Sequence, residues 1–136
     1  MNEVRVGRVS SINYEAGTVR VVYLDKCDKT TAELPVFCGM GEYQMPQIND
    51  AVLVLHLSND SSIGIVMGRF WSAKNIPVQG AEGVYRKVFD SSGTAFLQVV
   101  SGALTLCGGQ DVTLSGKNGS ITLSQLIEMK QKVDSL

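Results

Sequence analysis

The stretch GTAFLQVVSGALTLCGGQDVTLSGKNGSITL, residues 93–123, decides the fold because it repeats a short apolar run followed by small turn residues. Three of these runs place two apolar residues two positions apart: Leu104/Leu106, Val112/Leu114 and Ile121/Leu123. This spacing predicts strands of about three to seven residues joined by tight turns. One copy of such thin strands leaves its edges unpaired and its apolar face uncovered. We therefore expect this half of the protein to be completed by further chains.

Composition and charge narrow the class of protein. The chain has 136 residues, of which 44% are hydrophobic, and its 14 glycines and 7% aromatics favour a β-rich globular protein. Its 12 Lys and Arg against 13 Asp and Glu give a formal net charge of -1, which excludes a general attraction to nucleic acid or anionic membranes. The start MNEVRVGRV has no apolar signal core, and no run approaches the ~18 apolar residues of a membrane span. We expect no export by an N-terminal signal.

Cysteine and histidine usage predicts no metal, cofactor or catalytic site. Cys27, Cys38 and Cys107 are odd in number and unrelated in spacing, which argues against a disulfide framework and for assembly in a reducing compartment. His56 is the single histidine and has no Cys or acid at metal-ligand spacing, so we expect a structural or surface role for it.

The first half of the sequence predicts a small barrel. Five alternating segments, residues 4–12, 19–23, 32–38, 51–58 and 63–70, are separated by polar or Gly-containing loops. Five strongly twisted strands in about 70 residues are typical of an OB-fold barrel. We assign residues 1–72 to this barrel.

Three details of the barrel strands can be predicted. Alternation in the first strand places its apolar residues on one half-buried face: Val4, Val6, Val9 and Ile12. Pro35 lacks the N–H that a central strand uses, so the third strand should be short or lie at an edge. His56 should share a face of its strand with Val52 and Val54.

The remaining segments are a linker, a shaft and a helix. Residues 73–83 lose periodicity and read as a linker, residues 84–123 carry the repeats, and residues 124–136 change to a helical period. The helix has a short heptad seam, spaced three, four and three: Leu126, Met129, Val133 and Leu136. Either Thr122 with Gln125, or Ser124, can cap it. So short a seam is marginal in water unless the chains are held together upstream.

Three passages resemble the baseplate assembly protein V family, the central spike proteins of contractile phage tails and of related bacteriocin and type VI secretion machines. They are VGRVSSINYEAGTVRVVYLD at 6–25, MPQINDAVLVLHL at 45–57 and IGIVMGRFWS at 63–72. The resemblance implies an all-β chain, with an N-terminal OB-fold barrel, a short intertwined trimeric β-helix or β-prism, and a C-terminal α-helix. It also implies a homotrimer at the centre of a baseplate.

The resemblance also implies partners and a location. Hub or tube proteins of the baseplate would bind at the barrel end, a separate tip protein is an option at the C-terminal end, and the target is a cell envelope. Nucleic acid is not an expected partner. Assembly would take place in the bacterial cytoplasm before the protein functions in a phage or phage-tail-like particle. Larger relatives carry a metal-binding His-x-His tip or an added enzymatic domain, and this sequence has neither, so we expect no enzyme activity and no cofactor.

In this spike interpretation the apolar pairs of the shaft point toward a shared trimer axis. The expected axis residues are Leu97, Val99, Leu104, Leu106, Val112, Leu114, Ile121 and Leu123. Thr105, Thr113 and Thr122 alternate with them and should face solvent. Phe70 and Trp71 lie at the barrel exit. They pack between neighbouring barrels or onto the linker, or they belong to the core of their own barrel.

An alternative function is single-stranded nucleic-acid binding, because OB barrels often bind nucleic acid through aromatics on a basic face. The candidate residues for such a face are Arg5, Arg8, Arg20, Tyr14 and Tyr23. The slightly negative net charge and the thin spread of aromatics weigh against this alternative.

Overall fold

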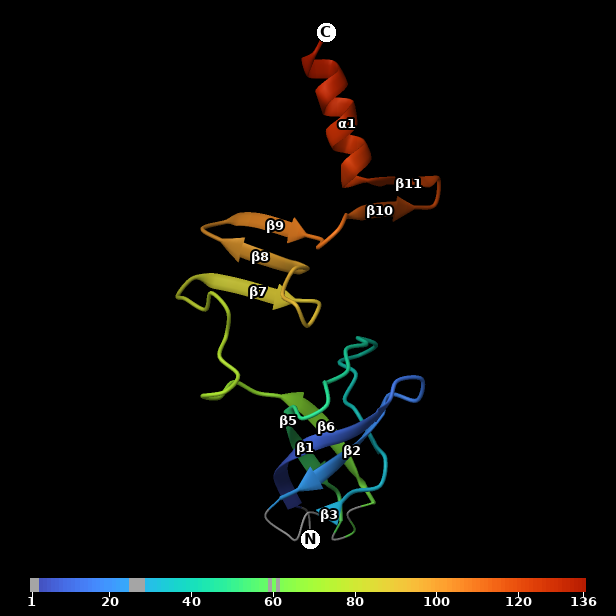
Figure 1. Ribbon diagram of the computed structural model, residues 1–136, viewed down its shortest axis with the longest axis vertical. Helices are drawn as coiled ribbons and strands as arrows, with labels where there is room; N and C mark the ends of the chain where they lie inside the picture. The colour runs from blue at the N-terminus through green and yellow to red at the C-terminus, as the bar shows by residue number, and fades with distance from the viewer. Residues whose placement is uncertain (1–2, 25–28, 59, 61) are drawn as a thin grey trace. The chain divides into compact units, whose positions relative to one another are not determined.

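The computed structural model describes residues 3–24, 29–58, 60 and 62–136. The chain is predominantly β, with one helix at its C-terminal end (Figure 1). It divides into two compact units, Met1–Pro77 and Val78–Leu136. The division falls within residues 73–83, which the sequence assigns to a linker.

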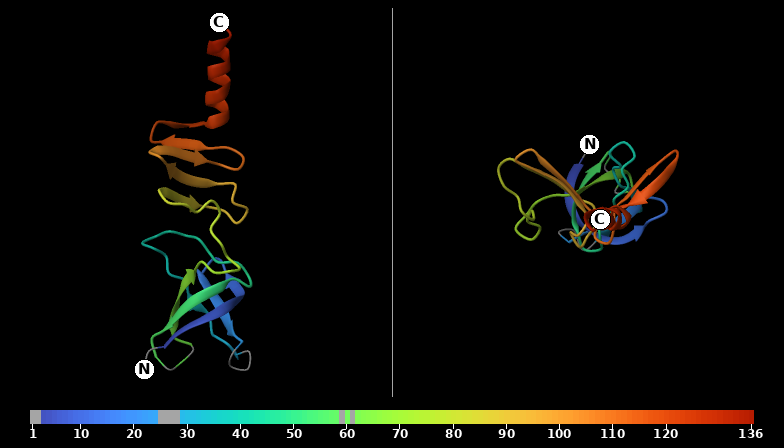
Figure 2. Two further views of the ribbon diagram at one scale, coloured as in Figure 1. Left: turned by 90° about the vertical axis from the view of Figure 1, so that its left-hand side faces the viewer. Right: turned by 90° about the horizontal axis from the view of Figure 1, so that it is seen from above.

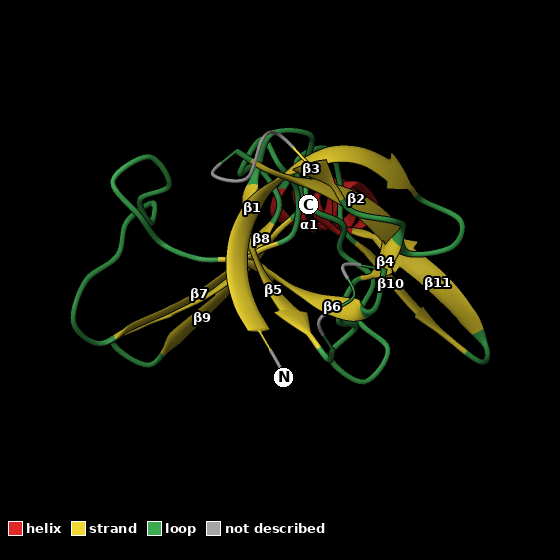
Figure 3. Ribbon diagram, turned by 90° about the horizontal axis from the view of Figure 1, so that it is seen from below, coloured by secondary structure: helices red, strands yellow, loops and turns green. Residues whose placement is uncertain are grey.

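The first unit is built on one curved antiparallel sheet (Figure 3). Its strands are β1 (Glu3–Asn13), β2 (Thr18–Tyr23), β3 (Lys29–Thr30), β4 (Leu34–Pro35), β5 (Ala51–His56) and β6 (Gly64–Arg69). The order is β3-β2-β1-β5-β6, with β4 also paired to β2. Among the described residues these ladders form an open path. An isolated parallel bridge between Val36 and Val66 joins the segment after β4 to β6, and the Phe37 N–H donates to the Val66 carbonyl at 2.8 Å.

The core of the described chain lies inside this sheet. Its members are Val9, Val19, Val21, Tyr23, Leu34, Val52, Val54 and Val66. Alternation in β2 and β5 puts these side chains on one face, so the predicted grouping of His56 with Val52 and Val54 is confirmed.

The predicted face of β1 is wrong in its first half. Val4 and Val6 are 63% and 55% exposed, whereas Arg5, Gly7 and Val9 point inward. A bulge between Val9 and Ser11, opposite β2, shifts the alternation. The interior has no room for a larger residue at position 7, since a Cβ there would lie 2.4 Å from Val21 Cγ1.

Two other expectations in the first unit differ in detail. The expected strand at 32–38 is reduced to β4, where Pro35 lies opposite Thr18, so the segment is short as the proline predicted. Phe70 and Trp71 are exposed and lie outside the core cluster, which removes the alternative that they fill the core of their own unit.

The second unit contains a three-stranded sheet, a hairpin and a helix (Figure 2). The sheet has the order β7 (Val84–Val88), β8 (Phe96–Val100) and β9 (Ala103–Cys107), and the hairpin pairs β10 (Thr113–Gly116) with β11 (Gly119–Thr122). Ser101 and Gly102 join β8 to β9 with φ of 50° and 79°, the positive values of a type I′ turn that suits the twist of a hairpin.

Helix α1 (Leu123–Asp134) begins one residue earlier than expected. Thr122 is its N-cap in a capping box with Gln125, so this alternative is confirmed over Ser124. Leu123, expected to end a strand, is the first residue of the helix, and Val112 precedes β10.

Candidate functional site

The β7-β8-β9 sheet gathers apolar side chains on one face. Leu97 lies directly opposite Leu106, and Val99 lies opposite Leu104. Directly paired residues of antiparallel strands share a face, so four of the expected axis residues are neighbours. Tyr85 extends the same face from β7, where it pairs with Val99. We call this face the aliphatic shaft face; besides Tyr85, Leu97, Val99, Leu104 and Leu106 it carries Lys87, which pairs with Leu97.

The opposite face of the sheet has a polar row at its centre. Arg86, Gln98 and Thr105 lie side by side on the three strands. The Arg86 Nη1 donates to Gln98 Oε1 at 2.6 Å, and the guanidinium lies 3.9 Å from the centre of the Phe96 ring. Thr105 therefore alternates with the apolar pairs as expected. The rows on both sides of this polar row are apolar: Val84, Val100 and Ala103 on one side, and Val88, Phe96 and Cys107 on the other.

The β10-β11 hairpin repeats this alternation on a smaller scale. Leu114 pairs with Ile121, and Thr113 pairs with Thr122 in the adjacent position. The Leu123 N–H donates to the Val112 carbonyl at 2.8 Å, which keeps these two residues together beyond the ends of the strands. The eight expected axis residues thus form two groups, four in the sheet and four at the hairpin.

Neither group is covered within one chain. Residues 78–136 are all described, and none of them is buried; Leu104 is 68% exposed. Globular sheets of this size normally bury one apolar face. The exposed shaft face, on a sheet whose outer strands are β7 and β9, marks the second unit as a candidate interaction site.

Helix α1 is equally uncovered. None of its residues is buried, and the three seam residues that it contains, Leu126, Met129 and Val133, are exposed. Leu136, expected as the fourth seam residue, lies beyond the end of the helix at Asp134. Its polar residues form two i,i+4 ion pairs, Glu128–Lys132 at 3.5 Å and Lys130–Asp134 at 3.0 Å. Exposed pairs of this kind contribute little to stability, so the helix depends on its N-terminal anchoring and on whatever covers its seam.

Asp111 provides part of that anchoring. Its carboxylate accepts hydrogen bonds from the Ser124 hydroxyl at 2.8 Å and from the Ser124 N–H at 3.2 Å. The hydroxyl bond is the main cause that holds the pKa of Asp111 below its ordinary value. A negative charge here also complements the helix N-terminus.

Asp90 organises the turn between β7 and β8. Its carboxylate accepts hydrogen bonds from the Thr94 hydroxyl at 2.6 Å, the Ser92 hydroxyl at 3.0 Å and the Ala95 N–H at 3.2 Å. The Thr94 bond is the largest of the causes that lower the pKa of Asp90 to about 2.

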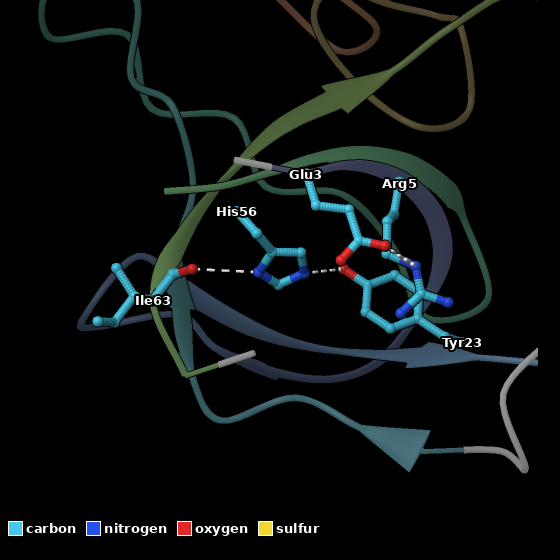
Figure 4. A network of polar contacts seen from close by, with 5 residues as sticks. All are labelled: Glu3, Arg5, Tyr23, His56 and Ile63. Atoms are coloured by element: carbon cyan, nitrogen blue, oxygen red, sulfur yellow. Dashed lines mark hydrogen bonds and ion pairs between the residues drawn. The ribbon is translucent and has the colours of Figure 1, made fainter. Parts of the chain in front are cut away.

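The interior of the first unit holds a polar network that sequence reasoning missed (Figure 4). The His56 Nδ1 lies 3.1 Å from the Ile63 carbonyl oxygen, and its Nε2 lies 2.6 Å from the Tyr23 hydroxyl. A carbonyl only accepts, so Nδ1 donates to it, and Nε2 shares a hydrogen bond with the Tyr23 hydroxyl. Arg5 lies 3.7 Å from the centre of the Tyr23 ring and forms an ion pair with Glu3 at 3.6 Å.

This network is structural. His56 is 3% exposed, and both of its ring nitrogens are engaged, which agrees with the structural role expected for it. Tyr23 is 1% exposed, and Arg5 packs on its ring, so these two residues are not placed to form a nucleic-acid face with Arg8, Arg20 and Tyr14. The sequence signal for the network was the regular alternation of β1 back from Val9, which places Arg5 on the inner side.

The described residues offer no metal site. They contain no cluster of His, Cys, Asp and Glu able to hold a metal ion. Cys38 is exposed and Cys107 is half-buried, both as free thiols, and Cys27 lies outside the described residues. The one described helix is too short and too polar to cross a bilayer.

No protein-family model and no curated protein matches this sequence.

Proposed function

We propose that this protein is a structural subunit of the central spike in the baseplate of a contractile injection system, either a phage tail or a phage-tail-like bacteriocin. Three copies associate, and the trimer transmits the force of contraction to the target cell envelope. The observation that carries this proposal is the second unit: fifty-nine residues, Val78–Leu136, with regular strands, apolar side chains on its sheet and no buried residue.

A three-fold axis accounts for this exposure. The aliphatic shaft face of each copy meets those of its neighbours, the edges of β7, β9, β10 and β11 pair between chains, and the helix seams close into a short three-helix bundle. A closed three-chain prism of this kind leaves no free strand edge along its length. Axial load is then shared by ladders between chains, which suits a part that pushes through an envelope.

The first unit fits an OB-type barrel at the tube side of the spike. Its sheet is curved, and the bridge from Val36 to Val66 links the segment after β4 to β6, the last strand of the path. In this role the barrel binds hub or tube proteins of the baseplate and not nucleic acid. The C-terminal helix is left to close the shaft or to receive a separate tip protein.

The proposal can be tested with one pair of aspartate substitutions in adjacent residues. Leu106→Asp places a charge on the shaft face, where trimerisation would bury it, and Thr105→Asp places the same charge in the polar row on the opposite side of the same strand. We expect the Leu106→Asp protein to sediment as a monomer and the Thr105→Asp protein to remain a trimer. A trimeric Leu106→Asp protein would remove the assigned axis.

The same pair tests the biological role. In the phage or bacterium that encodes this chain, particles made with the Leu106→Asp protein should lack complete baseplates in electron micrographs. Particles made with the Thr105→Asp protein should keep them. Normal, infective or bactericidal particles carrying Leu106→Asp would contradict the spike function.

A further inference from the structure

The two units differ in what holds their strands together. Eight side chains close a core inside the first unit, where the Tyr23 hydroxyl is also hydrogen-bonded to His56. Residues 78–136 are all described, and none of them is buried. Burial of apolar surface is the main term that offsets the conformational entropy lost when a chain folds. The first unit therefore has that term within one chain, and the second unit lacks it.

The second unit also consists of three pieces that support one another little. The strands of its sheet pair only among themselves, and so do β10 and β11. In the fully described stretch from 78 to 136, the one extensive contact between sheet, hairpin and helix joins α1 to β11. An isolated two-stranded hairpin and a helix of twelve residues are each marginal in water, and a small sheet needs its apolar face covered. No piece is large enough to be stable alone.

Polar contacts do not replace the missing core. Two of the bonds that shape this unit, from Thr94 to Asp90 at 2.6 Å and from Ser124 to Asp111 at 2.8 Å, lie at exposed sites. Water offers these groups equivalent bonds in the unfolded chain, so their net contribution to folding is small. They set the geometry of a turn and of a helix start once the chain is folded, but they do not drive its folding.

We propose that Val78–Leu136 takes this fold only when another chain covers it. Before association the protein is then a folded first unit that carries a disordered C-terminal segment of fifty-nine residues. Folding and association of the second unit are one event, as in other segments that become ordered on binding. The inference is drawn from burial within one chain, so it holds whatever the number or identity of the covering chains and does not depend on the proposed trimer.

Coupled folding makes the state of the second unit depend on the concentration of the covering chain. An unassembled subunit presents no preformed apolar sheet and no rigid strand edges, which are the features that pair wrongly between proteins. Sheet, hairpin and helix form together when the covering chain binds, because none of them is stable before it. A half-formed second unit is therefore not a populated state.

Hydrogen–deuterium exchange followed by mass spectrometry tests this inference in the full chain. The native protein is labelled across a dilution series, its mass in solution is measured at each concentration, and Leu106→Asp supplies a monomer where dilution does not. In the monomer, peptides from β8, β9 and α1 should lose their protection and exchange at the rate of an unfolded peptide. Peptides from β1, β2 and β5 should keep the protection that they have in the associated protein. Thr105→Asp is the control for the added charge.

The outcomes separate this inference from the proposed function. Protection of the second unit that disappears as a trimer dissociates, with the first unit still protected, supports both. A monomer at every concentration, with only its first unit protected, supports coupled folding and overturns the proposed trimer, because the covering chain is then a different protein. A monomer whose second unit is protected overturns coupled folding, and so does a monomer whose first unit exchanges freely.

Discussion

Gly7 shows how a single missing Cβ sets the packing of the first unit. A methyl group at this position would lie 2.4 Å from Val21 Cγ1 and 2.7 Å from Tyr23 Cε1. We expect Gly7→Ala to lower the free energy of unfolding by ~1–3 kcal/mol, since overpacking forces neighbouring side chains to shift. Urea unfolding measures the change in the free energy of unfolding. Gly116→Ala is the control, because a Cβ there meets nothing within 4 Å. Equal stability of the two variants would show that the interior rearranges around a larger side chain without cost.

Tyr23 is expected to matter through its hydroxyl as well as its ring. Tyr23→Phe removes the hydroxyl that is hydrogen-bonded to the buried Nε2 of His56. We expect this loss to lower the free energy of unfolding by ~1–3 kcal/mol. Tyr43→Phe is the matched control, since it removes a hydroxyl that donates to the Tyr14 carbonyl at an exposed site. Thermal unfolding of both variants gives the comparison, and a neutral Tyr23→Phe would mean that the network does not hold the strands together.

The same residues show where prediction from sequence succeeded and failed. Alternation alone placed His56 on the face of Val52 and Val54, because β5 is regular. It failed for Val4 and Val6, because β1 alternates regularly up to Val9, which puts even-numbered positions outside, and because Arg5 finds interior partners far along the chain. Such partners depend on tertiary contacts, which local spacing does not contain.

Among the elements, the β7-β8 turn should depend on pH. The folded pKa of Asp90 is about 2, below its ordinary value of 3.8, so its ionised form stabilises the turn. That contribution is fully present above pH 3.8 and is lost as the pH falls toward 2. Over this range the difference in melting temperature between the native protein and Asp90→Asn should shrink. A difference that stays constant with pH would show that the carboxylate charge is not involved.

Helix α1 should depend on its cap. Thr122→Ala removes the side-chain acceptor of the Gln125 N–H and should cost ~1 kcal/mol of stability. Circular dichroism at 222 nm during thermal unfolding reports the helix. Thr113→Ala changes the residue paired with Thr122 across the hairpin and should leave the helix signal unaffected; equal losses in the two variants would assign the effect to the hairpin.

The elements were more predictable than their ends. The change of hydrophobic period and the Thr122/Gln125 pair predicted the helix, and Ser101-Gly102 predicted a tight turn. No local pattern indicates that Leu123 leaves its strand to start the helix. That boundary is set by contacts from Val112 and Asp111, residues eleven or more positions upstream.

At the scale of the whole molecule, the two units differ in how much they bury. The eight core residues all belong to the first unit, whereas no residue of the second is buried. The repeats at 93–123 predicted this incompleteness, because strands so short cannot cover their own apolar side. In the proposed trimer the contacts that complete the shaft lie between chains, so neither the pattern of one sequence nor the fold of one chain contains them.

The mass of the native protein in solution tests the central claim most directly. Sedimentation equilibrium at several dilutions, without denaturant, should give three times the 14.7 kDa mass of one chain. The trimer should persist at low micromolar concentration, since its strands pair between chains. A mass of 14.7 kDa, in a protein whose circular dichroism shows that the strands and helix are formed, would contradict the account.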